Sequence, residues 1–244
     1  MPLFNIIKLD AISSTNDYLK KKYKSNNCKD GYIIWTKEQT HGKGQREKEW
    51  ISQKGKSLTI SIYKEFNEFQ VSNSFILNAI VSLSIVKTLK IIGLKEVRIK
   101  WPNDIMSGNK KLGGILIENF LKSEFISSSI IGIGLNINEE KFEDLPNATS
   151  LYMEINQKFK LKKILNILIQ ELLKFFNLQE DKQNMIIDMY SSYLWKLNIA
   201  SDFKQENNLL KAKVKGINSS GNLILEMPDG SISAFNSNEI KMIY

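Results

Sequence analysis

The secondary-structure pattern changes near residue 198, and this change constrains the fold more than any other feature of the sequence. Beyond it the chain holds only short apolar strands, which we predict at residues 209–217, 222–226, 231–235 and 240–243. Ser219-Ser220-Gly221 and Pro228-Asp229-Gly230 separate them as tight turns. Short strands at this spacing are typical of a small β-barrel, so we predict a separate C-terminal domain at residues 198–244.

Residues 1–197 mix helices with strands and form the larger predicted domain. Ser14 is a candidate helix N-cap, with Asp17 placed to complete a capping box, and Gly93 ends a long apolar helix. We predict helices at residues 14–24, 71–92, 161–176 and 183–197, and strands at residues 32–36, 57–63, 97–101, 111–118 and 125–138. A chain of 244 residues accommodates one such α+β domain and a small appendage.

The formal charge of +8 raises the question of a nucleic-acid partner. The net charge is +7 over residues 1–64, +1 over residues 65–196 and zero over residues 197–244. Of the 34 cationic side chains 32 are lysine, and only Arg46 and Arg98 carry the guanidinium that binds bases and phosphates bidentately. Charge confined to one quarter of the chain and poor in arginine weakens the interpretation as a nucleic-acid coat.

The single cysteine, Cys28, and the single histidine, His41, exclude several kinds of site. One cysteine allows no internal disulfide and no multi-cysteine metal cluster, and one histidine allows no His-rich metal site. The sequence has no run of about 18 uninterrupted apolar residues, and it shows no secretory signal pattern. We therefore expect a cytoplasmic protein without a membrane-spanning segment.

Residues 39–50, which read Gln-Thr-His-Gly-Lys-Gly-Gln-Arg-Glu-Lys-Glu-Trp, form the first candidate binding segment. Gly42 and Gly44 let backbone amides approach a ligand closely, while Lys43 and Arg46 supply positive charge. The segment is not a P-loop, because no Gly-Lys-Ser/Thr triplet follows at the required spacing. This composition suits an anionic phosphate, although a solvated connection between two strands has the same character.

Three further motifs place polar groups at strand ends. Lys100-Trp101-Pro102-Asn103-Asp104 predicts a tight turn that aims an amide and a carboxylate outward, as is common where a lysine or Mg²⁺ is oriented. Lys111-Leu112-Gly113-Gly114 sets a lysine beside glycines that let a ligand approach. Gly132-Ile133-Gly134-Leu135-Asn136 lacks the third glycine of a dinucleotide site but leaves an amide to pair with a base edge. Taken singly, the first motif has the character of an ordinary turn, the second that of a solvated lysine, and the third that of a plain strand.

Together and in this order, the Ser13-Ser14-Thr15-Asn16 helix start, the basic loop and the three motifs resemble the signature series of the biotin protein ligases, also called biotin–[acetyl-CoA-carboxylase] ligases. The resemblance covers about residues 8–138, and the C-terminal barrel fits the same layout. It implies a class II synthetase-like catalytic domain, in which a mixed β-sheet is flanked by helices, followed by an SH3-like barrel. It also implies that ATP and Mg²⁺ convert biotin to biotinyl-5′-AMP, from which the biotinyl group passes to one lysine of a carrier protein, such as the acetyl-CoA carboxylase carrier subunit.

The resemblance assigns roles residue by residue. Gln39 matches the glutamine that contacts biotin, and Lys111 matches the lysine that bridges the biotin carboxylate and the α-phosphate. Asn103 and Asp104 are expected near the phosphates and the metal, and Asn136 near adenine. The other residues expected to line the biotin and ATP sites are Ser14, Thr15 and Asn16 at the helix start, Gly42, Lys43, Gly44, Gln45, Arg46 and Trp50 in the loop, and Gly113 and Gly114 after Lys111.

The expected chemistry explains these residue types. A carboxylate that attacks a phosphate is repelled by like charge, so we expect Lys111 and Lys43 to act as electrostatic catalysts. Asp104 is the candidate Mg²⁺ ligand and, as a hypothesis, the base that deprotonates the carrier lysine. A loop that closes over the mixed anhydride would protect it from water.

The loop departs from the family pattern G-R-G-x-x-G at two positions. Lys43 replaces an arginine and loses the bidentate fork, and Glu47 replaces a glycine and adds bulk and negative charge. We therefore predict faster release of free biotinyl-AMP than from a loop with the family residues. An inactive, degenerate ligase is the extreme form of this alternative.

Two other functions compete with biotin ligation. A lipoate–protein ligase shares the catalytic fold and the adenylation chemistry, whereas a non-enzymatic nucleic-acid-binding module would use the basic N-terminal region. The Ser-Thr-Asn segment begins near residue 14, so we expect no helix-turn-helix domain before it and no specific DNA binding. The resemblance allows either a monomer or a homodimer.

Overall fold

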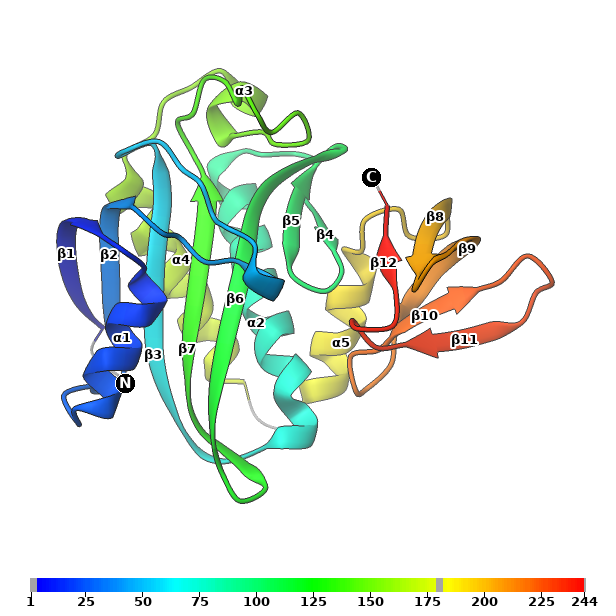
Figure 1. Cartoon of the computed structure of the whole chain (residues 1–244), viewed down its shortest axis with the longest axis horizontal. Helices are drawn as coiled ribbons and strands as arrows, with labels where there is room; N and C mark the ends of the chain where they lie inside the picture. The colour runs from blue at the N-terminus through cyan, green and yellow to red at the C-terminus, as the bar shows by residue number, and fades with distance from the viewer. Residues whose placement is uncertain (1–3, 179–181, 244) are drawn as a thin grey trace. The chain divides into compact units, whose positions relative to one another are not determined.

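The computed structural model describes residues 4–178 and 182–243, and the chain divides into two compact units. The first unit comprises Met1–Val71 and Lys111–Asn166, and the second comprises Ser72–Lys110 and Ile167–Tyr244. Both units combine helices with strands (Figure 1), which confirms the predicted α+β fold. The boundary between residues 197 and 198 stays a prediction.

The first unit is built on a mixed β-sheet that contains the strand order β1-β2-β3-β7-β6. These strands are β1 (Asn5–Ile12), β2 (Tyr32–Gln39), β3 (Ser57–Gln70), β6 (Lys110–Lys122) and β7 (Phe125–Asn136). β1 and β2 run parallel, whereas β3 is antiparallel to both β2 and β7, and β7 is antiparallel to β6. β7 is buried along nearly its whole length, as suits a central strand that is covered on both faces.

Helix α1 (Thr15–Lys24) packs against β2, β3 and β7 of this sheet (Figure 1). Ser14 caps the helix as predicted, because its side chain accepts a hydrogen bond from the Asp17 backbone N–H. The predicted return contact is wrong: the Asp17 carboxylate pairs with Lys43 of the following loop. Leu19 on the inner face of α1 is fully buried and anchors the helix to the sheet.

The second unit packs α2 (Ser74–Ile92) against α5 (Gln183–Ser192) and against β5 (Asp104–Ser107), which pairs antiparallel with β4 (Arg98–Lys100). Gly93 ends α2 in the left-handed conformation, as predicted. Residues 71–92 are long and apolar enough to cross a membrane, but 67% of their most apolar window is buried inside the protein. Burial on this scale is typical of a core helix.

Two further α-helices of the described residues are α3 (Leu151–Ile155) and α4 (Leu161–Phe176), the second of which confirms its prediction. The C-terminal part of the second unit is an antiparallel sheet of strand order β11-β10-β9-β8-β12. Its strands are β8 (Ala200–Gln205), β9 (Asn208–Ile217), β10 (Leu223–Glu226), β11 (Ile232–Phe235) and β12 (Lys241–Met242).

One predicted helix end is wrong. Helix α5 ends at Ser192 rather than near Leu197, because the next residues pair with β4. Ile99 N–H donates to Tyr193 O, and Trp195 N–H donates back to Ile99 O, both at 2.8 Å. The backbone hydrogen bonds that would extend the helix are thus used to join this segment to the hairpin.

Candidate active site

Gln39, the last residue of β2, is held in place by hydrogen bonds with Thr15 at the start of α1. Its amide oxygen accepts from the Thr15 backbone N–H at 2.8 Å and from the Thr15 hydroxyl at 3.0 Å. The Ser61 hydroxyl of β3 lies behind this pair, 2.7 Å from the Thr15 hydroxyl. Since the amide oxygen accepts these two bonds, the NH₂ group of Gln39 lies on the other side of the amide, beside Gly42.

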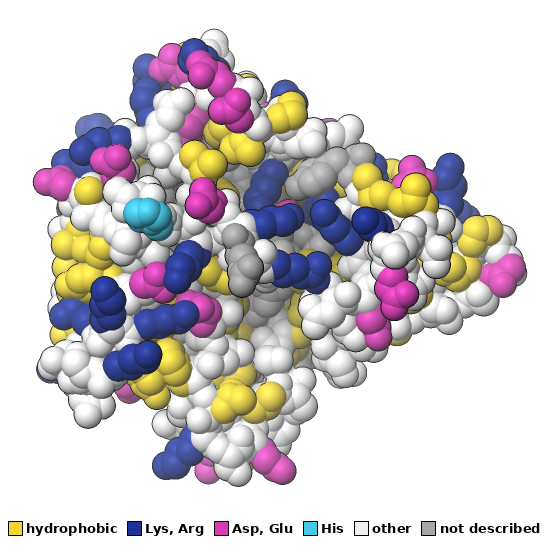
Figure 2. All heavy atoms as spheres, in the orientation of Figure 1, with side chains coloured by type: hydrophobic (Ala, Val, Ile, Leu, Met, Phe, Trp, Pro, Cys, Tyr) yellow, Lys and Arg dark blue, Asp and Glu magenta, His cyan; other side chains and the backbone are white. Residues whose placement is uncertain are grey.

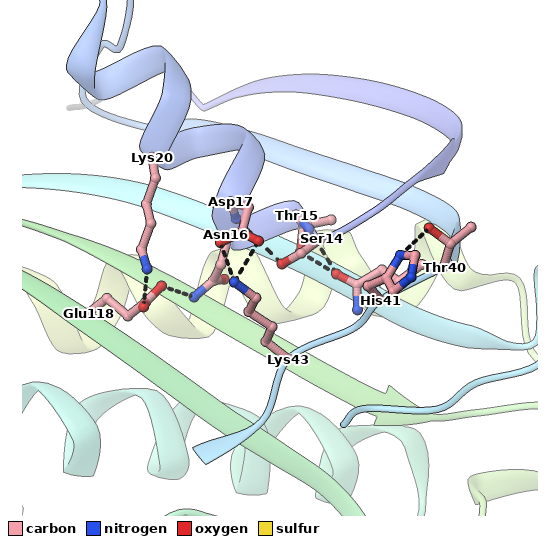
Figure 3. A network of polar contacts seen from close by, with 10 residues as sticks. Ser14, Thr15, Asn16, Asp17, Lys20, Thr40, His41, Lys43 and Glu118 are labelled. Atoms are coloured by element: carbon pink, nitrogen blue, oxygen red, sulfur yellow. Dashed lines mark hydrogen bonds and ion pairs between the residues drawn. The ribbon is translucent and has the colours of Figure 1, made fainter. Parts of the chain in front are cut away.

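Asn16 is held in the same way by side chains of two strands, β3 and β6. Its amide NH₂ donates to Glu118 of β6 at 2.8 Å, and its amide oxygen accepts from Ser61. Lys20, one turn along α1, forms an ion pair with Glu118 (Figure 3). The site therefore includes Ser61 and Glu118, which sequence analysis missed because single residues inside long strands carry no local signal.

The loop after β2 is folded back as a narrow hairpin. Gly44 N–H donates to Lys48 O at 2.6 Å, and Trp50 N–H donates to Gly42 O at 2.9 Å. A Cβ at Gly42 would lie 2.3 Å from Trp50 O and 2.6 Å from the Gln39 amide nitrogen, so only glycine fits. The backbone of Gly42 therefore packs closely against Gln39, which with Thr15, Asn16 and Ser61 forms a polar cluster at the start of α1. Arg46 lies in the short turn Gln45–Glu47, at a φ of 54°.

An ion pair ties this loop to α1. The Lys43 ammonium lies 2.7 Å from one oxygen of Asp17 and 3.0 Å from the other (Figure 3). The hydrogen bond to Asp17 raises the pKa of Lys43. About half of the Lys43 side chain is exposed, so water and salt screen the pair. Lys43 is therefore held near α1 by a contact that a ligand with more negative charge can replace.

Trp50 at the end of the loop lies over glycines of β6 and β7. A Cβ at Gly134 would lie 2.4 Å from the indole Cε2, and a Cβ at Gly114 would lie 3.7 Å from the indole. The Lys111 ammonium lies 5.9 Å from the centroid of the same ring, at cation–π range. Gly134 clears the space for the indole, whereas Gly113 is placed differently, against Leu135 of β7.

Asn136 at the end of β7 is buried and points toward the segment before α3. Its NH₂ group donates to Thr149 O at 3.0 Å, which leaves mainly its amide oxygen for a ligand. The Ser57 hydroxyl is 3.4 Å from that oxygen and bonds more closely to Glu139. Burial raises the pKa of the Glu139 carboxyl. Lys111 is anchored nearby through its backbone, since its N–H donates to Asn147 O at 2.7 Å and its carbonyl accepts from Thr149 N–H.

Asn103 and Asp104 belong to the second unit. They are half-buried in the turn between β4 and β5, and Asp104 is already the first residue of β5. Lys100 lies directly opposite Asp104 in the pairing register, so their side chains share one face. Lys100 is only 6% exposed, although lysine is rarely buried, and sequence analysis quoted it in the motif without assigning it a place in the site.

Several lysines of the first unit form ion pairs with carboxylates. Figure 2 shows Lys and Arg side chains over α1 with acidic side chains among them. The pairs that involve residues 1–64 include Lys20–Glu118, Lys37–Asp10, Lys43–Asp17, Lys54–Glu38, Lys56–Glu140 and Lys64–Asp30. Most of these carboxylates belong to the same segment, so the net charge of +7 over residues 1–64 remains. The scarcity of arginine therefore remains what weighs against a nucleic-acid coat.

Comparisons with known proteins identify the family. A sequence model described as the biotin/lipoate A/B protein ligase family matches residues 9–136, and one described as the biotin protein ligase C-terminal domain matches residues 203–242. The bifunctional ligase/repressor BirA of Bacillus spizizenii is 27% identical over 232 residues, covering 93% of this chain and 70% of that protein. The biotin–[acetyl-CoA-carboxylase] ligase of Mycobacterium tuberculosis is 29% identical over 150 residues, covering 59% of this chain and 54% of that protein.

A solved structure shows the same fold. The biotin protein ligase of Aquifex aeolicus, solved in complex with biotin and ATP, superposes with a TM-score of 0.82 at 25% identity and covers 98% of both chains. The matched segment 9–136 contains Gln39, Trp50 and Lys111, and both halves of the expected layout are matched. The chain therefore belongs to the biotin/lipoate A/B protein ligase family, as a biotin protein ligase.

Proposed function

We propose that this protein uses ATP to convert biotin to biotinyl-5′-AMP and pyrophosphate, and then transfers the biotinyl group to one lysine of a biotin carrier protein. One arrangement carries the proposal. The Lys111 ammonium lies at cation–π range from Trp50, the Trp50 backbone is hydrogen-bonded to Gly42, and Gly42 lies against the Gln39 amide of the polar cluster. This arrangement supplies donors for a polar ring at one end, an apolar wall, and a cation for a carboxylate. Biotin has this sequence of groups along its length.

The polar cluster would bind the ring end of biotin. The Gln39 NH₂ group is left to donate because its amide oxygen accepts both bonds from Thr15. The indole of Trp50 would pack along the aliphatic chain, which suits its place over Gly134. The loop would thus cover biotin along its length and exclude water from the carboxylate.

Lys111 would stabilise the activation step. One carboxylate oxygen of biotin attacks the α-phosphorus of ATP, the new P–O bond forms, and pyrophosphate leaves with the electron pair of the broken bond. Negative charge gathers between carboxylate and phosphate in the transition state, where a fixed ammonium is most effective. Lys43 would add a second cation after exchanging Asp17 for a phosphate.

Bound to ATP, Mg²⁺ would neutralise part of the phosphate charge. No group of three or more His, Cys, Asp or Glu side chains that could hold a metal gathers among residues 4–178 and 182–243. Phosphate oxygens and water would then provide most ligands, with Asp104 as the one matched carboxylate, an arrangement that Mg²⁺ commonly accepts.

Asp104 would act again in the transfer step. The amine of the carrier lysine attacks the carbonyl carbon of biotinyl-AMP, the amide bond forms, and AMP leaves as the C–O bond breaks. The amine loses a proton in this step, and Asp104 is the proposed acceptor. The proposed carrier is a biotin carrier subunit of a carboxylase such as acetyl-CoA carboxylase, and the proposed place of action is the cytoplasm.

The test is to incubate the protein with Mg-ATP, a biotin carrier domain and either biotin or lipoate. We expect biotin-dependent pyrophosphate release and one biotinylated lysine on the carrier. Preference for lipoate would favour the alternative ligase. Release of pyrophosphate without either acid would contradict both assignments.

A further inference from the structure

The carbonyl of Pro102, in the turn that carries Asn103 and Asp104, accepts hydrogen bonds from two helices, one from a half-buried side chain and one from a fully buried side chain. Asn78 of α2 donates its side-chain N–H at 2.5 Å, and Tyr190 of α5 donates its hydroxyl at 2.8 Å. All of these residues belong to the second unit. A carbonyl oxygen has two lone pairs, so the two bonds satisfy it completely.

Fixing this carbonyl fixes the backbone of the next residue. The peptide bond between Pro102 and Asn103 is planar, so the direction of the carbonyl determines the direction of the Asn103 N–H. Asp104 follows at once and enters β5 opposite Lys100. The direction in which the polar side chains of the turn leave the backbone therefore depends on the two donors.

Tyr190 is built to stay in place. Its side chain is fully buried, and its ring meets the Phe75 ring edge-on with centroids 5.2 Å apart. Burial, together with the nearby negative charge of Asp104, raises the pKa of the Tyr190 phenol well above its usual value. The phenol therefore remains protonated, and able to donate, throughout the working pH range.

The other end of the turn is held by the C-terminal sheet. The indole N–H of Trp101 donates to Gly221 O at 2.9 Å, in the turn between β9 and β10. Phe75 occupies the space that a side chain at Gly221 would need, since a Cβ there would lie 2.0 Å from the Phe75 ring. Phe75 thus contacts both Tyr190 and the Gly221 turn.

We propose that Tyr190 is a positioning residue for the ligase reaction, which acts through the Pro102 carbonyl to aim Asp104, with Asn78 as the second donor. The proposal rests on the proposed function, because it takes Asp104 to be part of the reaction. It assigns to α5 a catalytic purpose beyond packing, although α5 itself carries none of the predicted site residues.

The test compares two single-atom deletions at the end of α5. Tyr190→Phe removes only the buried phenol oxygen and keeps the ring contact with Phe75. Tyr193→Phe is the matched control, because its hydroxyl accepts a hydrogen bond from the exposed Lys90, at 3.1 Å. We expect Tyr190→Phe to lower kcat for carrier biotinylation about fivefold to thirtyfold, the effect of a lost buried hydrogen bond. The KM for biotin should stay within about twofold, because the biotin-lining residues belong to the first unit.

A double-mutant cycle separates positioning from general damage to the fold. In the Asp104→Asn background, Tyr190→Phe should have little further effect on kcat, because the group that it aims is already lost. Independent, multiplying effects would overturn the proposal, as would equal kcat values for Tyr190→Phe and Tyr193→Phe. If Tyr190→Phe fails to fold, Asn78→Ala carries the same cycle. Inactivity of the unaltered protein with biotin would instead contradict the proposed function.

Discussion

The start of α1 and the Trp101–Asp104 turn hold their polar groups in different ways. At α1, side chains bind one another, and the loop is tied by the exposed Lys43–Asp17 pair. At the turn, the half-buried Asn78 amide and the buried Tyr190 hydroxyl both donate to one backbone carbonyl, that of Pro102. Exposed ion pairs contribute little and are easily exchanged, whereas a buried polar group left without its partner is costly. We infer that the first region changes its contacts when substrates bind, while the second keeps its geometry.

The largest expected effect comes from removing the cation of the first region. Lys111→Ala should lower biotin-dependent pyrophosphate release about a hundredfold or more, the usual effect of losing a charge at the transition state. Lys110→Ala is the matched control, because Lys110 is the exposed neighbour at the start of β6. Near-normal release by Lys111→Ala would show that the first region does not supply this charge.

The rigidity of the second region is tested by Gly221→Ala. The new methyl group collides with Phe75, and Gly221 has a φ of 81°, which disfavours other residues. We expect the free energy of unfolding to fall by about 2–4 kcal/mol in urea titrations. Gly230→Ala has a similar φ of 84° but open space around the added atom, so it should cost only about 1 kcal/mol. Equal losses would mean that Phe75 moves freely and that the turn is not held rigidly.

The fit of Trp50 over the sheet is tested by Gly134→Ala. A Cβ there displaces the indole, so we expect the KM for biotin to rise about tenfold, as for a loss of about 1.4 kcal/mol in binding. Gly114→Ala adds the same atom at ordinary contact distance from Trp50 and Lys111 and should raise the KM less. If Gly114→Ala has the larger effect, the indole does not form the wall of the biotin site.

The smallest effects should come from residues 39–50, the loop whose Lys43 is held by the exposed ion pair with Asp17. The double variant Lys43→Arg/Glu47→Gly should release free biotinyl-AMP more slowly, by about threefold, because arginine binds phosphate bidentately. Lys54→Arg, in another exposed ion pair with Glu38, is the control and should change the release rate little. Equal leakage from the unaltered protein and the double variant would contradict this reading of the loop.

Much of the fold was predictable because local patterns determined it. The Ser14 cap, the Gly93 stop and the turn at Gly221 carry their own chemistry in the sequence. The end of α5 was not predictable, since residues after Ser192 leave the helix to pair with Ile99, far away in the chain. Long-range backbone pairing overrides local helical preference there.

The candidate site divides in the same way. Gln39, Trp50 and Lys111 stand in compact motifs that the resemblance could assign, and the structure brings these three into one unit. Ser61 and Glu118 act through contacts across 45 and 102 residues of sequence, so no local pattern reveals them. The Asp17–Lys43 pair replaced the expected capping box for the same reason: the partner comes from a distant loop.

Biotin transfer is tested most directly by mass analysis of a biotin carrier domain after incubation with the unaltered protein, biotin and Mg-ATP. For a biotin protein ligase that works as proposed, we expect the mass gain of one biotinyl group, located on one lysine, and its loss with Lys111→Ala. An unmodified carrier domain, or one modified with lipoate in preference to biotin, would contradict it.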